Sequence, residues 1–451
     1  MMKCIQASTK AFVLSIAAIL CLSLFDSIAS ETGFGGGFIA SAEAQEKKRT
    51  KTRRLPGISE RVFKQLGEAS EYLSPPEDSA LEPDFKKALA ELQSLEKKCK
   101  KCNKYELAQI YRLMAFSHFS LNDYDSAISY YDKVVAQSPD IPIAVELNAL
   151  YALSQLTFSQ AKYDRSLAYL KQWMKLSTDV GADIYYLLAT IEYQKGDKKR
   201  SLFDVSKAIK MTEERGKVAK EPWYNLQKVL YIEGEDYKSA SEVLQKLILS
   251  YSKADYWMQL SGVYGYLGQE RNQLHALEAA RLMGALEKRQ HYINLASLYL
   301  NEGAPYKAAQ VMEAGLKNNI IEPESKNLEI LATAWSQAKE TEKAIEVLTA
   351  ASAKSENGEL YARLLNLYLD IDDKQSAVDA GNKALEAGGL RRPSDVYTNL
   401  GVAYTQLKNY KAAIRAFDEA MKDERNRGFA ANWKRFAESE LSREQQLKAA
   451  L

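Results

Sequence analysis

The sequence predicts an all-α protein, a solenoid of about nine to ten helix pairs that ends in a capping helix. Three observations predict it. The 451 residues include 22 glycines and 10 prolines, too few for many short strands joined by tight turns. Apolar residues recur at the spacing of one helical face along most of the chain. In addition, one pattern of two short helices returns about every 33 to 39 residues.

The charges of the chain are nearly balanced. Lysine and arginine number 61 and aspartate and glutamate number 59, so the formal net charge is +2. Proteins whose main partner is nucleic acid usually present a surface of one sign. The balance therefore argues against a nucleic-acid partner. Apolar residues make up 46% of the chain, which is enough to build a buried core.

Residues 1–44 are expected to be a signal peptide. Two lysines precede the apolar run 11–25, which has the length of a signal peptide and is short for a membrane span. Two candidate cleavage sites, each with small residues two positions apart, end at Ala29 and at Ala44. We favour cleavage after Ala44 because a polar tail follows it. The segment predicts an exported protein, and the alternative is an uncleaved anchor.

Two segments precede the repeats. Residues 45–56 form a basic linker, whose simplest interpretation is a disordered tail. The alternative is peripheral contact with anionic lipid or cell-wall polymer. Residues 57–107 are predicted to form an irregular helical hairpin. At its end, Asn103 and Glu106 have the spacing of a capping pair that starts the next helix.

Cys99 and Cys102 are the two cysteines that remain once the signal is removed. Export to an oxidising compartment favours a disulfide between them, which staples a turn. Two free thiols or a redox function are the alternatives. A zinc site needs four ligands and no second cysteine pair is present, while a thioredoxin-type site needs a strand before the motif, where this sequence predicts helix.

The stretch 395–422 shows the repeat most clearly. Each half places small and apolar residues on one helical face, and the polar turn LKNY joins the halves. These residues are Tyr397, Leu400, Gly401 and Tyr404 in the first half, and Ala413, Phe417 and Ala420 in the second. Together with the units upstream of it, this stretch makes nine units in register over residues 108–424. The pattern resembles the tetratricopeptide repeat, which implies a right-handed superhelix with a long concave face.

Residues 425–451 are predicted to form the capping helix. One face carries Phe429, Trp433, Phe436 and Ala437, and the other positions are largely charged. A solenoid needs such a segment because its last repeat has no neighbour to cover its apolar face.

The first helix of each pair is expected to line the concave face and to bind a protein partner. For Phe116 and Phe119 the alternative is packing against the first hairpin. Some tetratricopeptide proteins bind acidic C-termini through a lysine–asparagine clamp, but the unit with Asn366 has Ala362 where the lysine is expected. The predicted partner-binding residues are Arg112, Phe116, Phe119, Tyr151, Gln155, Met258, Ile293, Ser297, Glu329 and Thr333.

Catalytic motifs are absent from the sequence. It contains no phosphate-binding glycine loop before a lysine, no H-E-x-x-H and no G-x-S-x-G. The acidic residues alternate with basic ones on outward helix faces, a pattern typical of solvated pairs. We therefore expect a protein that is not an enzyme, with no catalytic residues, no cofactor and no metal site.

A closer resemblance lies in the stretches 256–286, 295–316 and 356–370 and in the pattern ANWKRF of the last helix. They are similar to exported tetratricopeptide proteins of Gram-negative bacteria that accompany TonB–ExbB–ExbD clusters. The resemblance implies a periplasmic scaffold, accessory to TonB-dependent energy transduction and iron-complex uptake. Its partner would be a TonB–ExbB–ExbD component or a receptor. The alternative is an envelope-assembly adaptor for cell-wall or outer-membrane biogenesis proteins.

Overall fold

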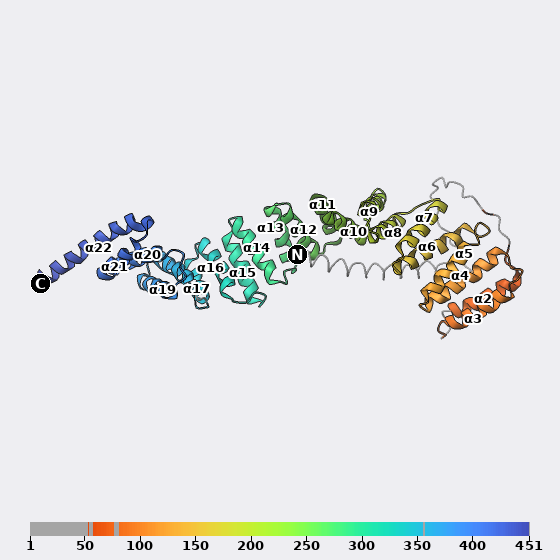
Figure 1. Ribbon diagram of the computed structural model, residues 1–451, viewed down its shortest axis with the longest axis horizontal. Helices are drawn as coiled ribbons and strands as arrows, with labels where there is room; N and C mark the ends of the chain where they lie inside the picture. The colour runs from red at the N-terminus through yellow and green to blue at the C-terminus, as the bar shows by residue number, and fades with distance from the viewer. Residues whose placement is uncertain (1–52, 54–56, 76–80, 355–356, 451) are drawn as a thin grey trace. The chain divides into compact units, whose positions relative to one another are not determined.

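The computed structural model describes residue 53 and residues 57–75, 81–354 and 357–450. Over these residues the chain forms twenty-one helices, α2 to α22, and no strand (Figure 1). The prediction of an all-α solenoid of helix pairs is therefore confirmed. The predicted signal peptide, 1–44, lies outside the described residues. Within them, no helix combines the length and apolar character that a membrane span requires.

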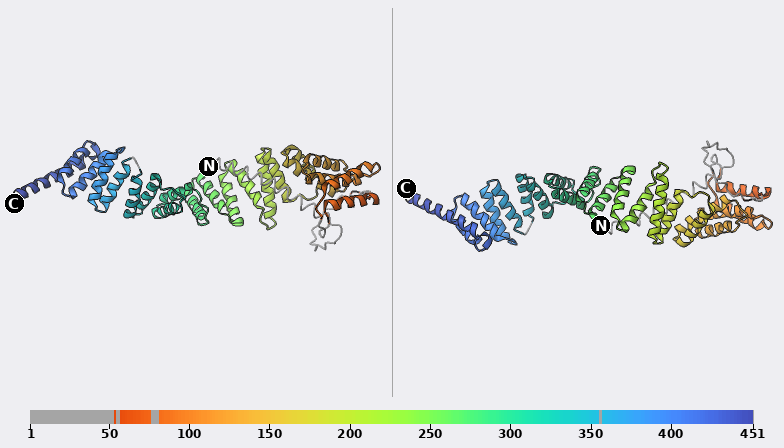
Figure 2. Two further views of the ribbon diagram at one scale, coloured as in Figure 1. Left: turned by 90° about the horizontal axis from the view of Figure 1, so that it is seen from below. Right: turned by 90° about the horizontal axis from the view of Figure 1, so that it is seen from above.

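The chain divides into two compact units, Met1–Asp236 and Tyr237–Leu451. In the first unit each helix packs against the next one in the chain, from α2 to α10 (Figure 2). These helices are α2 Glu60–Leu73, α3 Phe85–Lys98, α4 Lys104–Ser120, α5 Tyr124–Val135, α6 Ile143–Ser159, α7 Tyr163–Leu176, α8 Ala182–Gln194, α9 Lys198–Glu213 and α10 Glu221–Glu233.

The second unit repeats the same arrangement from α11 to α22. Its helices are α11 Tyr237–Tyr251, α12 Ala254–Tyr266, α13 Glu270–Leu282, α14 Arg289–Asn301, α15 Pro305–Lys317, α16 Ser325–Gln337, α17 Thr341–Ser352, α18 Glu359–Asp370, α19 Lys374–Ala387, α20 Pro393–Gln406, α21 Tyr410–Ala420 and α22 Glu424–Ala450. The boundary between the units falls between α10, the last helix of the first unit, and α11, the first helix of the second.

The first hairpin is joined to the repeats by polar contacts. Asn103 caps α4, and the reciprocal bonds between Asn103 and Glu106 form the capping box that the sequence predicted. Helix α4 thus begins at Lys104. From the linker, the guanidinium of Arg53 donates to the Glu146 carboxylate of α6 at 2.6 Å and to the Ile141 carbonyl at 3.0 Å. This basic residue therefore lies against the repeats of the first unit.

Small residues allow neighbouring helices to approach closely, both within a pair and between consecutive pairs. A methyl group on Gly401 would overlap the ring of Phe417, and one on Gly381 would overlap the side chain of Leu400. Phe417 and Leu400 are themselves buried. The glycine on α20 therefore makes room for the aromatic ring of α21, as the repeat pattern predicted.

The turn inside each pair from α4–α5 to α20–α21 has a recurrent backbone conformation. A residue with positive φ precedes the second helix, and it is Asn122 before α5, Asp372 before α19 and Lys408 before α21. In other pairs a glycine, such as Gly303 before α15, has the same conformation. The next residue caps the second helix in several repeats: Asp373, for example, accepts a hydrogen bond from the Ser376 amide at 3.1 Å.

Helix α22 covers the last repeat and contacts both α21 and α20. Its fully buried residues are Ala430 and Ala437, while Phe429 and Phe436 remain 51% and 52% exposed. The sequence placed both phenylalanines on the packed face, and that detail is wrong. The small alanines form the contact because they let α22 lie close to α21, and the large rings flank it.

Candidate functional site

A groove of 460 Å³ lies between α18 and α20, the first helices of two consecutive repeats in the second unit. The two helices are in contact beneath it, and Leu365 and Val396 supply buried apolar walls. Amide, acidic and basic side chains line the rest. The full lining is Glu359, Ala362, Arg363, Leu365, Asn366, Leu390, Arg391, Arg392, Asp395, Val396 and Asn399.

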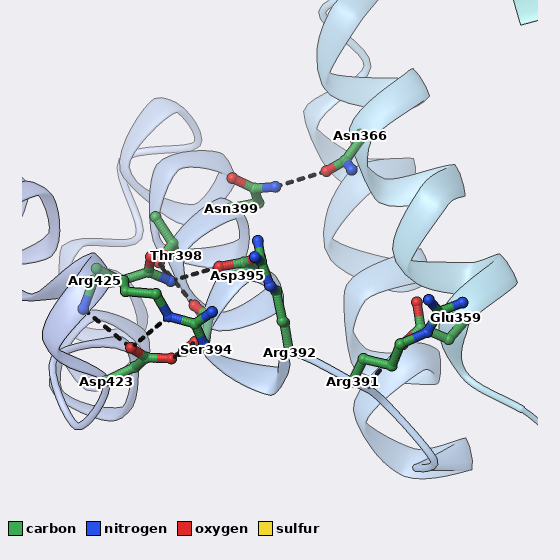
Figure 3. Close-up of polar contacts among 11 residues, drawn as sticks. Glu359, Asn366, Arg391, Arg392, Ser394, Asp395, Thr398, Asn399, Asp423 and Arg425 are labelled. Carbon is green, nitrogen blue, oxygen red and sulfur yellow. Dashed lines mark hydrogen bonds and ion pairs between the residues drawn. The ribbon is translucent and has the colours of Figure 1, made fainter.

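Two asparagine side chains face each other across the groove (Figure 3). The Nδ2 of Asn399 donates to the Oδ1 of Asn366 at 2.6 Å. This bond uses one group of each amide, so the nitrogen of Asn366 and the oxygen of Asn399 can still bond to a ligand. One donor and one acceptor side by side match the alternating amide and carbonyl groups of an extended peptide backbone.

Two arginines stand at the entrance, in the loop that leads into α20. The backbone amide of Arg391 donates to the Glu359 carboxylate at 2.5 Å, which fixes the loop to the start of α18 (Figure 3). The Nη1 of Arg392 lies 3.3 Å from a carboxylate oxygen of Asp395, and the two side chains are 60% and 44% exposed. No ion pair of the Arg391 guanidinium is found among the described residues. An arginine in this position can bind a carboxylate through two parallel hydrogen bonds.

A polar network holds the start of α20 behind the arginines. The Asp423 carboxylate accepts hydrogen bonds from Arg425 at 2.6 and 3.1 Å and from the hydroxyl of Ser394 at 3.1 Å. The bonds from Arg425 hold the pKa of Asp423 well below its usual range. Asn426 of α22 donates to Asp395 at 2.8 Å. The capping helix therefore supports one wall of the groove.

Two of the predicted partner-binding residues lie next to the groove. The guanidinium of Arg363 donates to Glu329 at 3.0 Å and to the Thr333 hydroxyl at 2.9 Å. Glu329 and Thr333 belong to α16 and Arg363 to α18. Their contact extends the polar lining from the groove onto the preceding repeat.

Three other predicted residues of the second unit lie along α12 and α14. Met258 and Ile293 are half-buried and pack against the apolar core of α13 to α16. Ser297 is exposed, and its hydroxyl donates to the Ile293 carbonyl at 2.8 Å. These side chains offer limited polar contact to a partner.

The aromatic residues predicted for the first unit pack within it. The ring of Phe116 meets that of Phe85 on α3 edge to face, with centroids 6.3 Å apart. This is the packing against the first hairpin that the sequence left open. Phe119 instead contacts Tyr124 of its own repeat at 5.9 Å.

The other predicted residues of the first unit are partly or fully buried. Arg112 is half-buried and donates to Gln109 at 3.1 Å. Tyr151 is half-buried, and burial raises the pKa of its phenol. Gln155 is 3% exposed, which removes it from the accessible surface. Its place on a first helix predicted exposure, but neighbouring side chains cover it.

Sequence reasoning missed the residues that define the groove. Arg391 and Arg392 lie in a loop between repeats, where the helical periodicity of the sequence gives no signal. Asn366 lies in a unit that lacks the lysine of the known clamp, since Ala362 stands at that position. The sequence does contain a signal for these arginines, the run LRRPSD at residues 390–395. In this run two arginines stand directly before the proline that starts α20.

The cysteine pair has the geometry of a disulfide, with the Cα atoms of Cys99 and Cys102 5.1 Å apart. Its oxidation in the cell remains a prediction. No group of His, Cys, Asp and Glu suited to a metal ion occurs in the described part of the chain.

A family model described as tetratricopeptide repeat matches residues 105–141 and 394–422. These stretches correspond to the pairs α4–α5 and α20–α21. The repeat that the sequence predicted is therefore confirmed near both ends of the array. No curated protein matches the chain.

Several solved structures are similar to the chain. A tetratricopeptide repeat protein from Parabacteroides merdae is 16% identical, covers 58% of this chain and 99% of its own, and has a TM-score of 0.35. YrrB, described as a TPR protein with an unusual peptide-binding site, is 14% identical, with coverages of 44% and 96% and a TM-score of 0.35. The Cut9–Hcn1 hetero-tetramer is 13% identical, with coverages of 83% and 90% and a TM-score of 0.29.

Proposed function

We propose that this tetratricopeptide repeat protein is a protein–protein interaction scaffold whose groove between α18 and α20 binds an extended segment of its partner. The observation that carries the proposal is the amide pair Asn366–Asn399 beside Arg391 and Arg392. The amides provide a donor and an acceptor for a peptide backbone. The arginines provide charge for a carboxylate, either an acidic side chain or a C-terminus.

The groove suits a peptide better than a small substrate. Its lining combines apolar walls with polar groups on one side, and its 460 Å³ volume accommodates a few residues of a chain. Its carboxylates are occupied: Glu359 accepts from the Arg391 amide, and Asp395 contacts Arg392 and Asn426. The groups left for a ligand are thus mainly amides and guanidinium groups, which bind but do not transfer protons at neutral pH.

The partner we propose is a periplasmic segment of a TonB–ExbB–ExbD complex or of a receptor that it energises. The sequence supports this through the predicted signal peptide, residues 1–44, and through the resemblance of the stretches 256–286, 295–316 and 356–370. In this role the scaffold acts in the periplasm and helps couple inner-membrane energy to iron-complex uptake.

Crosslinking in intact cells tests the proposed partner. Cells grown without iron are treated with a crosslinker, the protein is purified through a tag, and attached proteins are identified by mass spectrometry. Recovery of TonB, ExbB, ExbD or a receptor, together with slower iron-complex uptake in a deletion strain, is the expected result. Recovery of cell-wall or outer-membrane biogenesis proteins, with uptake unchanged, would replace the proposal by the adaptor role.

A further inference from the structure

The run KKCKKC, residues 97–102, covers the end of α3 and the start of the loop that leads to α4, and two lysines precede each of its cysteines. Cys99 is 7% exposed and lies in an apolar cluster with Val62, Leu95 and Ile110. Cys102 packs against the same cluster. Because both cysteines point inward, the four lysines beside them are directed to solvent, and all four are exposed.

These lysines border an open hollow of 870 Å³ at the first hairpin. Arg61 of α2 adds a fifth cation, and its guanidinium donates to the Lys98 carbonyl at 3.3 Å. We call this site the lysine hollow. Its lining is Gly57, Ile58, Ser59, Arg61, Val62, Lys97, Lys98, Lys100, Lys101, Cys102, Asn103 and Glu106.

Glu106 is the single carboxylate in the lysine hollow, and it is already engaged. It accepts hydrogen bonds from the Ser59 amide and hydroxyl at 2.8 and 2.6 Å and from the Asn103 amide at 2.8 Å. Burial acts to raise the pKa of Glu106, but these bonds together lower it. The carboxylate thus ties the start of α2 to the start of α4 and shapes the hollow.

The hollow therefore has an excess of positive charge that the described residues do not neutralise. None of the four lysines forms an ion pair with a carboxylate of the described chain. Five cations face one carboxylate in a concave site. Concave sites lined by one sign of charge concentrate the field and attract the opposite charge.

We propose that the lysine hollow binds an acidic segment, rich in Asp and Glu, of a partner protein. Lysines are point charges on flexible stems, so they suit several carboxylates without fixed geometry. The concave shape suits a chain segment that enters it, whereas a flat bilayer surface would meet only the rim. The site belongs to the first unit and is independent of the groove between α18 and α20.

The binding test uses the chain from residue 45 and a fluorescein-labelled peptide of ten glutamates, followed by fluorescence anisotropy. The variant K97Q/K98Q/K100Q/K101Q removes the four lysines. The control K171Q/K199Q/K317Q/K383Q removes four exposed lysines elsewhere, so the net charge changes equally. We expect about tenfold weaker binding for the first variant and at most about twofold for the control.

Equal weakening by both variants would overturn the proposal, because the peptide would then respond to net charge alone. So would binding of vesicles containing phosphatidylglycerol without binding of the peptide. The variant C99S/C102S frees the loop and is expected to bind the peptide about threefold more weakly. Unchanged binding by that variant would contradict the link between the inward-facing cysteines and the outward direction of the lysines.

Discussion

Arg363 joins two consecutive repeats, since its guanidinium contacts Glu329 at 3.0 Å and Thr333 at 2.9 Å on the preceding first helix. All three side chains are half-buried. The contact fixes the polar face of α16 relative to α18 and borders the groove. It therefore links the stability of the stack to the geometry of the candidate site.

We expect Arg363→Ala to lower the free energy of unfolding by about 0.5–1 kcal/mol, the usual value of a partly exposed ion pair. Urea unfolding of the single variants, of Glu329→Ala and of the double variant measures the coupling between the two side chains. Arg415→Ala, an exposed residue of α21, is the control. A coupling energy of zero would show that Arg363 and Glu329 act independently.

Gly401→Ala is expected to destabilise the second unit by about 1–3 kcal/mol, because the new methyl group overlaps the Phe417 ring. Gly428 of α22 provides a matched control, since a methyl group there meets no atom within 4 Å. Gly428→Ala should stabilise by up to about 1 kcal/mol. Thermal unfolding of both variants checks this pair. Similar effects at the two positions would contradict the close helix approach at Gly401.

Stability of the first unit is expected to fall as pH rises through neutrality. Glu192 on α8 and Asp204 on α9 are 3% and 7% exposed and share a hydrogen bond. Burial, together with Asp204, raises the pKa of Glu192 to about 7, although Arg200 opposes the shift. Between its ordinary pKa of 4.5 and this raised value, the Glu192 carboxyl keeps its proton in the folded state and loses it in the unfolded chain. The resulting stabilisation of the folded state is fully present below about pH 4.5 and is lost as the pH rises to about 7.

Glu192→Gln removes this titration and keeps a side chain that can bond to Asp204. We expect it to be more stable than the parent by about 1–2 kcal/mol at pH 8, with little difference at pH 5. Urea unfolding between pH 5 and 8 measures it. The control Glu386→Gln changes an exposed carboxylate of α19. If the parent and Glu192→Gln keep parallel pH profiles, the buried pair does not titrate in this range.

Reduction of Cys99–Cys102 should lower the free energy of unfolding by about 2 kcal/mol, since the disulfide closes a very short loop. Thermal unfolding with and without a phosphine reductant measures the loss. The C99S/C102S variant is the control and should not respond to reductant. If the reductant leaves the unfolding temperature of the parent protein unchanged, Cys99 and Cys102 are free thiols and form no disulfide.

The repeat core could be predicted from the sequence because its pattern repeats. Leu400, Gly401 and Phe417 are buried where the pattern placed them. The turns could not be predicted in the same detail. Asn122, Asp372 and Lys408 adopt positive φ without being glycine. Because residues of several types adopt this conformation, no single residue type marks the turn in the sequence.

The candidate site was harder to predict, since it depends on contacts between repeats. The helical positions of Glu329 and Thr333 predict that they line the concave face, but they do not predict that Arg363 bonds to both. Phe116 occupies an expected face position yet packs on Phe85, a residue 31 positions earlier in the chain. Periodicity identifies which face of a helix is exposed within its own repeat. It does not identify which neighbour covers that face.

Site-specific photocrosslinking tests the central claim most directly. A photoreactive amino acid at position 362, which lines the groove and takes no part in the amide pair, is compared in cells with one at position 383, an exposed site on α19. We predict a discrete crosslinked partner from position 362 alone, and we expect R391Q/R392Q to abolish this crosslink and R415Q to leave it unchanged. Equal crosslinking from both positions, or an adduct indifferent to the loss of both arginines, would contradict binding in the groove.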